Sequence, residues 1–266
     1  MPPAAGKSRT SEDVVGNKDA LQGQWRLAVL LGGCLLVGGF LVSGLLLGRT
    51  EAWLWTAGAA AVVGFVLGTF RYHLPRNHPP GRPGMLRRTV GRANAVTLVR
   101  GGLLAAVAGF LFVEPVGVAG WFVAGCYTVA IVLDWVDGRL ARYDDHRTVL
   151  GERLDMALDT TGLVIAALVG IRWAAVPVWY LLVPVARYVY RGAVARRKRR
   201  GLPVAPLPES RVRRPLAGFQ MAFLAGALLP IAPGRAVWWV AVVAVVCSLI
   251  AFLRDYLAVT RRLPQP

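Results

Sequence analysis

The sequence predicts an all-α, polytopic integral membrane protein. Of its 266 residues, 56% are hydrophobic and only 17% are charged, which is too apolar for a soluble domain of this length. The mean hydropathy of +0.51 supports the same class. From residue 26 onward, apolar runs close to the ~20 residues that a helix needs to cross a bilayer follow one another. The three cysteines lie far apart without metal-ligand spacing, so neither a disulfide framework nor a zinc site is expected.

Eight apolar runs predict eight transmembrane helices. The run that begins at Ala174 is short and contains Pro177 and Pro184, which a membrane helix tolerates when its neighbours satisfy the freed carbonyls. The first 24 residues are polar and mixed in charge, which predicts a disordered tail. The predicted helices cover about 26–48, 52–70, 94–113, 117–138, 154–172, 174–190, 214–232 and 235–257.

Basic residues in alternate connections predict the orientation in the cell membrane. The connection from Arg71 to Arg92 carries six Arg and no acid, and the connection from Arg187 to Arg214 carries ten basic residues against one Glu. Because short cytoplasmic loops are enriched in Lys and Arg, both termini and the segment 134–159 are expected in the cytoplasm. The run RRKRR at 196–200 is expected to contact anionic membrane lipids. No aromatic interleaving accompanies this charge, so nucleic acid is not an expected partner.

Four aspartates at ordered spacings stand out in this apolar chain. Asp134 and Asp137 are three residues apart at the end of one predicted helix, and Asp155 and Asp159 are four apart at the start of the next. Each spacing places a pair on one helical face. A charge within a membrane segment costs roughly 2.5 to 3.5 kcal/mol, so such acids indicate a functional site. Four converging carboxylates require cations, and hard ions with oxygen ligands, Mg²⁺ first and Mn²⁺ second, suit them.

The residues between the two acid pairs indicate a substrate that carries phosphate. Gly138 and Gly151 remove side chains where the backbone can approach a ligand, and Ala141 keeps that wall small. Arg142, one turn after Gly138, can direct a guanidinium at phosphate. Metals, an arginine and anionic oxygens together are what phosphoryl transfer requires.

The pattern DxxDGxxARx8GxxxDxxxD from Asp134 to Asp159 resembles the signature of the CDP-alcohol phosphatidyltransferases. Every fixed position of that signature is present. The run NAVTLVR, from Asn94 to Arg100, resembles the opening of the family's first core helix, although Ala93 replaces the usual Pro. The resemblance implies a six-helix catalytic core over 94–258. It leaves a cytoplasmic tail over 1–24, two additional transmembrane helices over 25–71, a basic cytoplasmic linker over 72–93 and a short cytoplasmic tail over 259–266.

The resemblance also implies roles for individual residues. Asp134, Asp137 and Asp155 match metal ligands, and Asp159 matches the residue that touches metal and acts as general base on the acceptor hydroxyl. The basic pair Arg187 and Arg191 is a candidate for binding the acceptor. The positions expected to line the nucleotide site are Asn94, Thr97, Arg100, Gly138, Ala141, Arg142, Thr148 and Gly151.

The implied reaction is the transfer of a substituted phosphate from a CDP-alcohol to an acceptor alcohol. It is expected to depend on Mg²⁺, with two ions bound, and Mn²⁺ is the alternative metal. CDP-diacylglycerol is the expected donor, CMP the leaving group and a homodimer the expected assembly. Two alternatives stay open. A soluble CDP-alcohol can instead donate its headgroup to diacylglycerol, or the aspartates can form the path of a cation transporter. The clustering of the acids at one boundary beside Gly and Arg favours the enzyme.

Overall fold

The computed structural model describes residues 11–114, 117–144, 146–205 and 212–260. These residues form eight α-helices and two short 3-10 helices, and none of them forms a strand. Five helices (α1, α2, α4, α5 and α8) are long and apolar enough to cross a membrane. The predicted all-α, multi-pass membrane fold is therefore confirmed. The helices are α1 (Ser11–Leu46), α2 (Arg49–His73), α3 (Gly91–Gly109), α4 (Ala119–Tyr143), α5 (Val149–Arg172), α6 (Leu182–Arg199), α7 (Arg213–Ala227) and α8 (Gly234–Val259).

Helix α6 is displaced at both ends from its predicted span of 174–190. Ala174 has a φ of 55° and Pro177 is extended, and a 3-10 helix, η2 (Val178–Leu181), precedes α6. Proline removes a backbone donor and disfavours helical geometry in the residue before it, so the apolar run could not be helical from its start. The helix begins instead at Leu182, with Pro184 in its first turn, and continues through the basic residues to Arg199.

The predicted tail over 1–24 is also wrong in part, because residues 11–24 form the first turns of α1. Residues 1–10 lie outside the described part of the chain. Asn17 and Gln24 donate side-chain hydrogen bonds to the carbonyl oxygens of Leu86 and Arg88 at 3.2 and 3.1 Å. Tertiary contacts of this kind stabilise a helical segment that shows no apolar periodicity of its own.

The chain divides into two compact units. The first contains residues 1–109 and 132–159, and therefore α1, α2, α3, the second half of α4 and the first half of α5. The second contains residues 110–131 and 160–266, with the remaining halves of α4 and α5 and helices α6 to α8.

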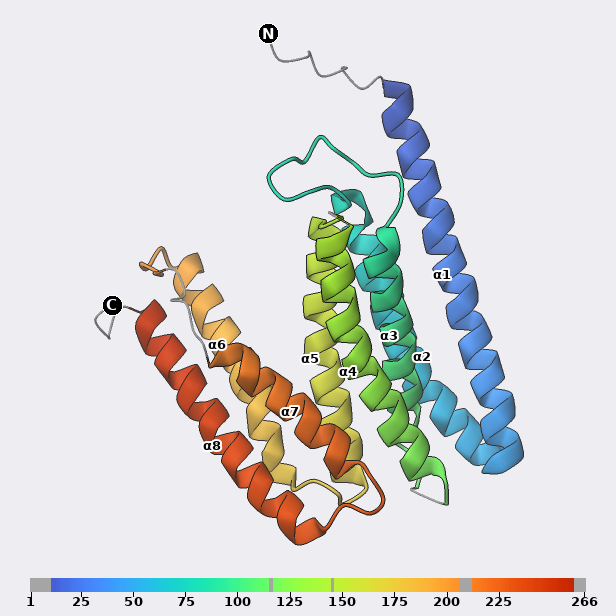
Figure 1. Cartoon of the computed structure of the whole chain (residues 1–266), viewed down its shortest axis with the longest axis vertical. Helices are drawn as coiled ribbons and strands as arrows, with labels where there is room; N and C mark the ends of the chain where they lie inside the picture. Colours follow the sequence, from blue (N-terminus) through green and yellow to red (C-terminus); the bar gives the residue numbers. More distant parts are fainter. Residues whose placement is uncertain (1–10, 115–116, 145, 206–211, 261–266) are drawn as a thin grey trace. The chain divides into compact units, whose positions relative to one another are not determined.

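In the first unit, α1, α2 and α3 lie side by side (Figure 1). Trp55 of α2 is only 4% exposed and fills the space between its two neighbours. Its indole ring lies where a Cβ at Gly39 of α1 or at Gly109 of α3 would be. The two glycines thus let a large aromatic side chain join three helices, as small residues do at interfaces between membrane helices.

In the second unit, polar contacts join α7 to α8. Gln220 donates a hydrogen bond to the hydroxyl of Ser248, and both side chains are buried. Nearer the basic end of α7, the Nε atom of Arg213 lies 2.9 Å from Oδ2 of Asp255. Polar pairs between membrane helices of this kind typically contribute about 0.6 to 2 kcal/mol.

The packing of Trp55 gives a test with adjacent glycines. Gly39→Ala should lower the midpoint of thermal unfolding in detergent, because the new methyl group would overlap the indole ring. Gly38→Ala is the matched control, since a Cβ there meets nothing within 4 Å. Equal midpoints for the two variants would contradict the close packing of α1 on α2.

Candidate active site

The four motif aspartates converge within the first unit. Helix α4 extends to Tyr143 and α5 begins at Val149, so both acid pairs lie inside helices that are longer than predicted. Asp134 and Asp137 are one turn apart on α4, and Asp155 and Asp159 are one turn apart on α5. Asp134, Asp137 and Asp155 each offer a carboxylate oxygen, and these oxygens lie within 4.8 Å of one another. The helical spacing in the sequence therefore becomes one cluster of oxygen atoms.

Arg100 of α3 lies at the centre of this cluster. Its Nη1 atom is 2.5 Å from Oδ1 of Asp134, 2.9 Å from Oδ1 of Asp155 and 3.7 Å from Oδ2 of Asp137. Its Nη2 atom forms an ion pair with Asp159. The side chain is only 3% exposed, so one buried guanidinium contacts all four carboxylates. The nucleotide contact predicted for Arg100 stays a prediction, and the partners of Arg100 in the structure are the four acids.

The charge within the cluster is not balanced by Arg100 alone. Four ionised carboxylates and one guanidinium leave three formal negative charges. Buried charges require partners, because the loss of hydration otherwise exceeds the gain from attraction. Carboxylate oxygens at this spacing are suitable ligands for a divalent metal ion, and the donor set fits a hard cation.

Thr97 fixes one of the carboxylates. Its hydroxyl donates to Oδ2 of Asp137 at 2.8 Å and lies 3.0 Å from the carbonyl oxygen of Ala93. Both Thr97 and Asp137 are buried, at 3% and 5% exposed. A buried carboxylate held by a neighbouring donor keeps one orientation, which is the role that supporting residues play around metal ligands. The nucleotide contact predicted for Thr97 stays a prediction.

Asn94 and Thr148 join the start of α3 to the start of α5. The Thr148 hydroxyl accepts a hydrogen bond from the backbone N–H of Gly151 at 3.1 Å, which caps the N-terminus of α5. The side-chain amide of Asn94 donates to the carbonyl of Val90 at 2.7 Å and lies 3.4 Å from the Thr148 hydroxyl. A Cβ at Gly151 would overlap the side-chain oxygen of Asn94, so only glycine allows this approach.

The remaining motif residues line the second half of α4. The guanidinium of Arg142 lies beside Gly138, with Nη1 3.6 Å from where a Cβ would be. Arg142 is exposed, and Gly138 and Ala141 are half-buried. The backbone at Gly138 and Ala141 is therefore partly accessible, and the guanidinium of Arg142 lies beside it. Such a surface suits a phosphate group, and the nucleotide roles of these three residues stay predictions.

Two expected acceptor residues belong to the other unit. Arg187 and Arg191 lie one turn apart on α6, which is part of the second unit. Their role in binding the acceptor stays a prediction.

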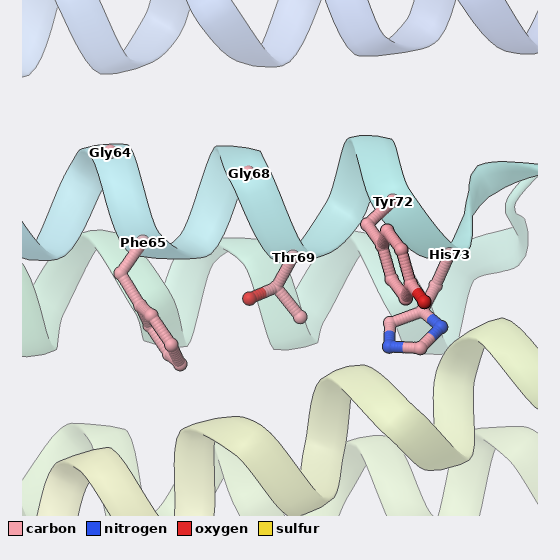
Figure 2. A pocket seen from close by; sticks show the side chains of 6 residues that line it. All are labelled: Gly64, Phe65, Gly68, Thr69, Tyr72 and His73. Atoms are coloured by element: carbon pink, nitrogen blue, oxygen red, sulfur yellow. The ribbon is translucent and has the colours of Figure 1, made fainter.

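A pocket on α2 is lined by none of the candidate site residues that were predicted from the sequence. It has a volume of about 350 Å³ and is lined by one face of α2 (Figure 2). Tyr72 and His73 stand at one end of it with their rings edge to face, 4.8 Å between centroids. The lining residues are Gly64, Phe65, Gly68, Thr69, Tyr72 and His73.

The contacts of Arg100 with the four acids, and those of the residues before α3, were not predicted from the sequence. An arginine inside an apolar helix is a sign of a buried acid partner, and this signal could have placed Arg100 among the aspartates. The hydrogen bonds of residues 77–90 join backbone groups to side chains that are distant in sequence, such as Asn17 and Gln24, and no sequence pattern encodes them.

The tight contact at Gly151 gives a second test. Gly151→Ala should lower thermal stability by about 1 to 3 kcal/mol, because a methyl group must displace Asn94 from between α3 and α5. Gly125→Ala, at a helical glycine with nothing within 4 Å of a new Cβ, should be neutral or stabilising. Unfolding in detergent measures both variants. A Gly151→Ala protein as stable as Gly125→Ala would contradict the described junction.

A family model described as CDP-alcohol phosphatidyltransferase matches residues 91–254. The match begins at the first residue of α3 and ends within α8, so it contains the four aspartates, Arg100 and Arg142. Helices α1 and α2 and the connection that follows them lie outside it. A comparison with curated proteins finds no match.

Proposed function

The chain belongs to the CDP-alcohol phosphatidyltransferase family, whose model matches more than half of it, and we therefore propose that it transfers a phosphatidyl group from CDP-diacylglycerol to an acceptor alcohol and releases CMP. Membership makes the protein a membrane transferase of phospholipid synthesis that uses a CDP-alcohol and an acceptor alcohol. The proposal goes further in naming the donor, the metal and the residues that act. The single observation that carries it is the convergence of the four carboxylates.

The metal is proposed to be Mg²⁺, with two ions bound and with Mn²⁺ able to replace them. Asp134, Asp137 and Asp155 would hold it through the oxygens that lie within 4.8 Å of one another, with Asp159 as a further ligand. Bound metal supplies positive charge that neutralises the pyrophosphate of the donor. The excess negative charge that Arg100 leaves uncompensated supports this assignment.

Asp159 is the proposed general base. It lies one turn after Asp155 on α5, and its side chain is 28% exposed, so an incoming hydroxyl can reach it. Its carboxylate takes the proton of the acceptor hydroxyl as the acceptor oxygen attacks the β-phosphorus of the donor. A new phosphorus–oxygen bond forms to the acceptor, and the bond between that phosphorus and the bridging oxygen breaks. CMP leaves with the bridging oxygen.

The donor is proposed to bind along the second half of α4. Gly138 and Ala141 leave room for the phosphates there, and the exposed guanidinium of Arg142 pairs with them. Asn94 at the start of α3 and Thr148 and Gly151 at the start of α5 are proposed to contact the nucleotide. We place this end in the cytoplasm, where CDP-linked compounds occur, because the Arg-rich connection 71–92 follows the positive-inside rule.

Two other functions make different predictions. An enzyme that moves a headgroup from a soluble CDP-alcohol to diacylglycerol would release CMP only when diacylglycerol is supplied. A cation transporter would carry Mg²⁺ into liposomes without any CDP-alcohol present. The family match favours transfer chemistry over transport.

The reaction is tested by incubating purified protein with CDP-diacylglycerol, Mg²⁺ and a panel of alcohols while CMP is measured. Asp159→Asn should slow CMP release by about 10² to 10⁴, the usual contribution of a general base, and EDTA should abolish it. Glu152→Gln, an exposed acid at the start of the same helix, should retain the wild-type rate within about twofold. Release that is indifferent to both Asp159→Asn and EDTA would exclude the mechanism.

Arg100 gives a separate test that does not depend on turnover. Arg100→Met removes the cation at the centre of four acids, which should destabilise the metal-free protein by about 3 to 5 kcal/mol. Mg²⁺ should restore the unfolding midpoint of this variant more than that of the wild type. Arg172→Met, which breaks an exposed pair with Glu114, is the control and should cost about 1 kcal/mol or less. The same loss with and without Mg²⁺ would contradict a cation site at the acids.

A further inference from the structure

The connection between α2 and α3, residues 77–90, is a folded segment held by a buried asparagine. Asn77 is fully buried, and its side-chain amide donates to the carbonyl oxygens of Arg87 and Thr89 at 3.2 and 2.8 Å. The backbone carbonyl oxygen of Asn77 accepts a hydrogen bond from the backbone N–H of Arg87 at 2.8 Å. Asn77 thus joins the start of the connection to its end by hydrogen bonds, as a short polar side chain often does in a tight loop.

This connection holds the segment that joins α4 to α5. The backbone N–H of Val149, the first residue of α5, donates to the carbonyl of His78 at 3.0 Å. His146 bridges the two segments, with Nδ1 3.1 Å from Nη1 of Arg87 and Nε2 3.2 Å from the carbonyl of Thr89. Burial and, next, the charge of Arg87 lower the pKa of His146, which favours the neutral ring that these two contacts need.

Helix α1 holds the same connection through two amide side chains. Asn17 donates to the carbonyl of Leu86 at 3.2 Å. Gln24 donates to the carbonyl of Arg88 at 3.1 Å and accepts from the N–H of Val90 at 2.9 Å. The two residues are seven apart, two turns of one helical face. The N-terminal end of α1 and the connection lie at the same end of the first unit (Figure 1).

The contacts continue into the proposed nucleotide site. The backbone N–H of Val90 donates to the side-chain oxygen of Gln24. The carbonyl oxygen of Val90 accepts a hydrogen bond from the side-chain amide of Asn94 at 2.7 Å. Asn94 in turn contacts Thr148 and fills the space beside Gly151. A continuous series of hydrogen bonds therefore runs from α1 to the first turn of α5.

We propose that Asn17, Gln24 and Asn77 are positioning residues for the donor: they hold the α2–α3 connection, which holds Asn94 and the start of α5 in the geometry that binds the CDP moiety. The proposal rests on the proposed function and gives α1 a part in it, although α1 lies outside the region that the family model matches. Loss of these bonds lowers the fraction of protein in the binding geometry, and apparent donor affinity falls by the same factor.

The test compares two glutamines on α1. Gln24→Ala should raise the KM for CDP-diacylglycerol roughly tenfold, with kcat and the acceptor KM nearly unchanged. Gln24→Glu keeps the oxygen that accepts from Val90 and should show a smaller rise. Gln22→Ala, an exposed residue two positions earlier on the same helix, should behave as the wild type. A fall in kcat or stability without a change in donor KM would overturn the proposal.

Hydrogen exchange separates this proposal from the proposed function. In Gln24→Ala, but not Gln22→Ala, amides of residues 147–151 should exchange several-fold faster, and saturating CDP should reduce the difference. A wild-type protein that releases no CMP and binds no CDP would overturn the proposed function and the donor role with it. Normal CMP release by the wild type together with unchanged exchange and unchanged donor KM in Gln24→Ala would overturn this inference alone.

Discussion

The ion pairs between Arg100 of α3 and four aspartates of α4 and α5 hold these three helices together in the first unit. Arg100 contacts all four carboxylates while almost fully buried, and Thr97 orients Asp137. One cation cannot neutralise four acids, so the cluster is arranged for additional positive charge. The negative charge that destabilises an apolar unit is also suited to the divalent cations that we propose for transfer from a CDP-alcohol. Stability and chemistry therefore depend on the same ion pairs.

The support for this cluster comes from more of the chain than the family match contains. Glycines at the contacts of Trp55 bring α1, α2 and α3 together, and Gly151 lets Asn94 of α3 approach α5. The connection 77–90 then links α1, through the side chains of Asn17 and Gln24, to the start of α5, through the backbone N–H of Val149. Helices that precede the matched region thus take part in shaping the end of the unit where the donor is proposed to bind.

The sequence was sufficient for the fold class and for the convergence of the acids, because helical periodicity translates spacing directly into position. It was insufficient where the outcome depends on distant partners. The position of the Arg100 guanidinium is set by acids on two other helices, and the helicity of residues 11–24 by contacts with residues 86–90. The start of α6 was misplaced because the effect of Pro177 on the preceding backbone outweighed an apolar run. Arg187 and Arg191 belong to the second unit, and their acceptor role stays a prediction.

Binding of Mn²⁺ to the purified protein in micelles, followed by the loss of the free-ion electron paramagnetic resonance signal, tests the central claim most directly. Wild-type protein should bind Mn²⁺ saturably, and Asp137→Asn should weaken that binding by about tenfold or more, since Asp137 is a buried carboxylate held in place by Thr97. Mg²⁺ should compete for the same site. Equal Mn²⁺ binding by the two proteins, or none by the wild type, would contradict a metal centre built from these aspartates.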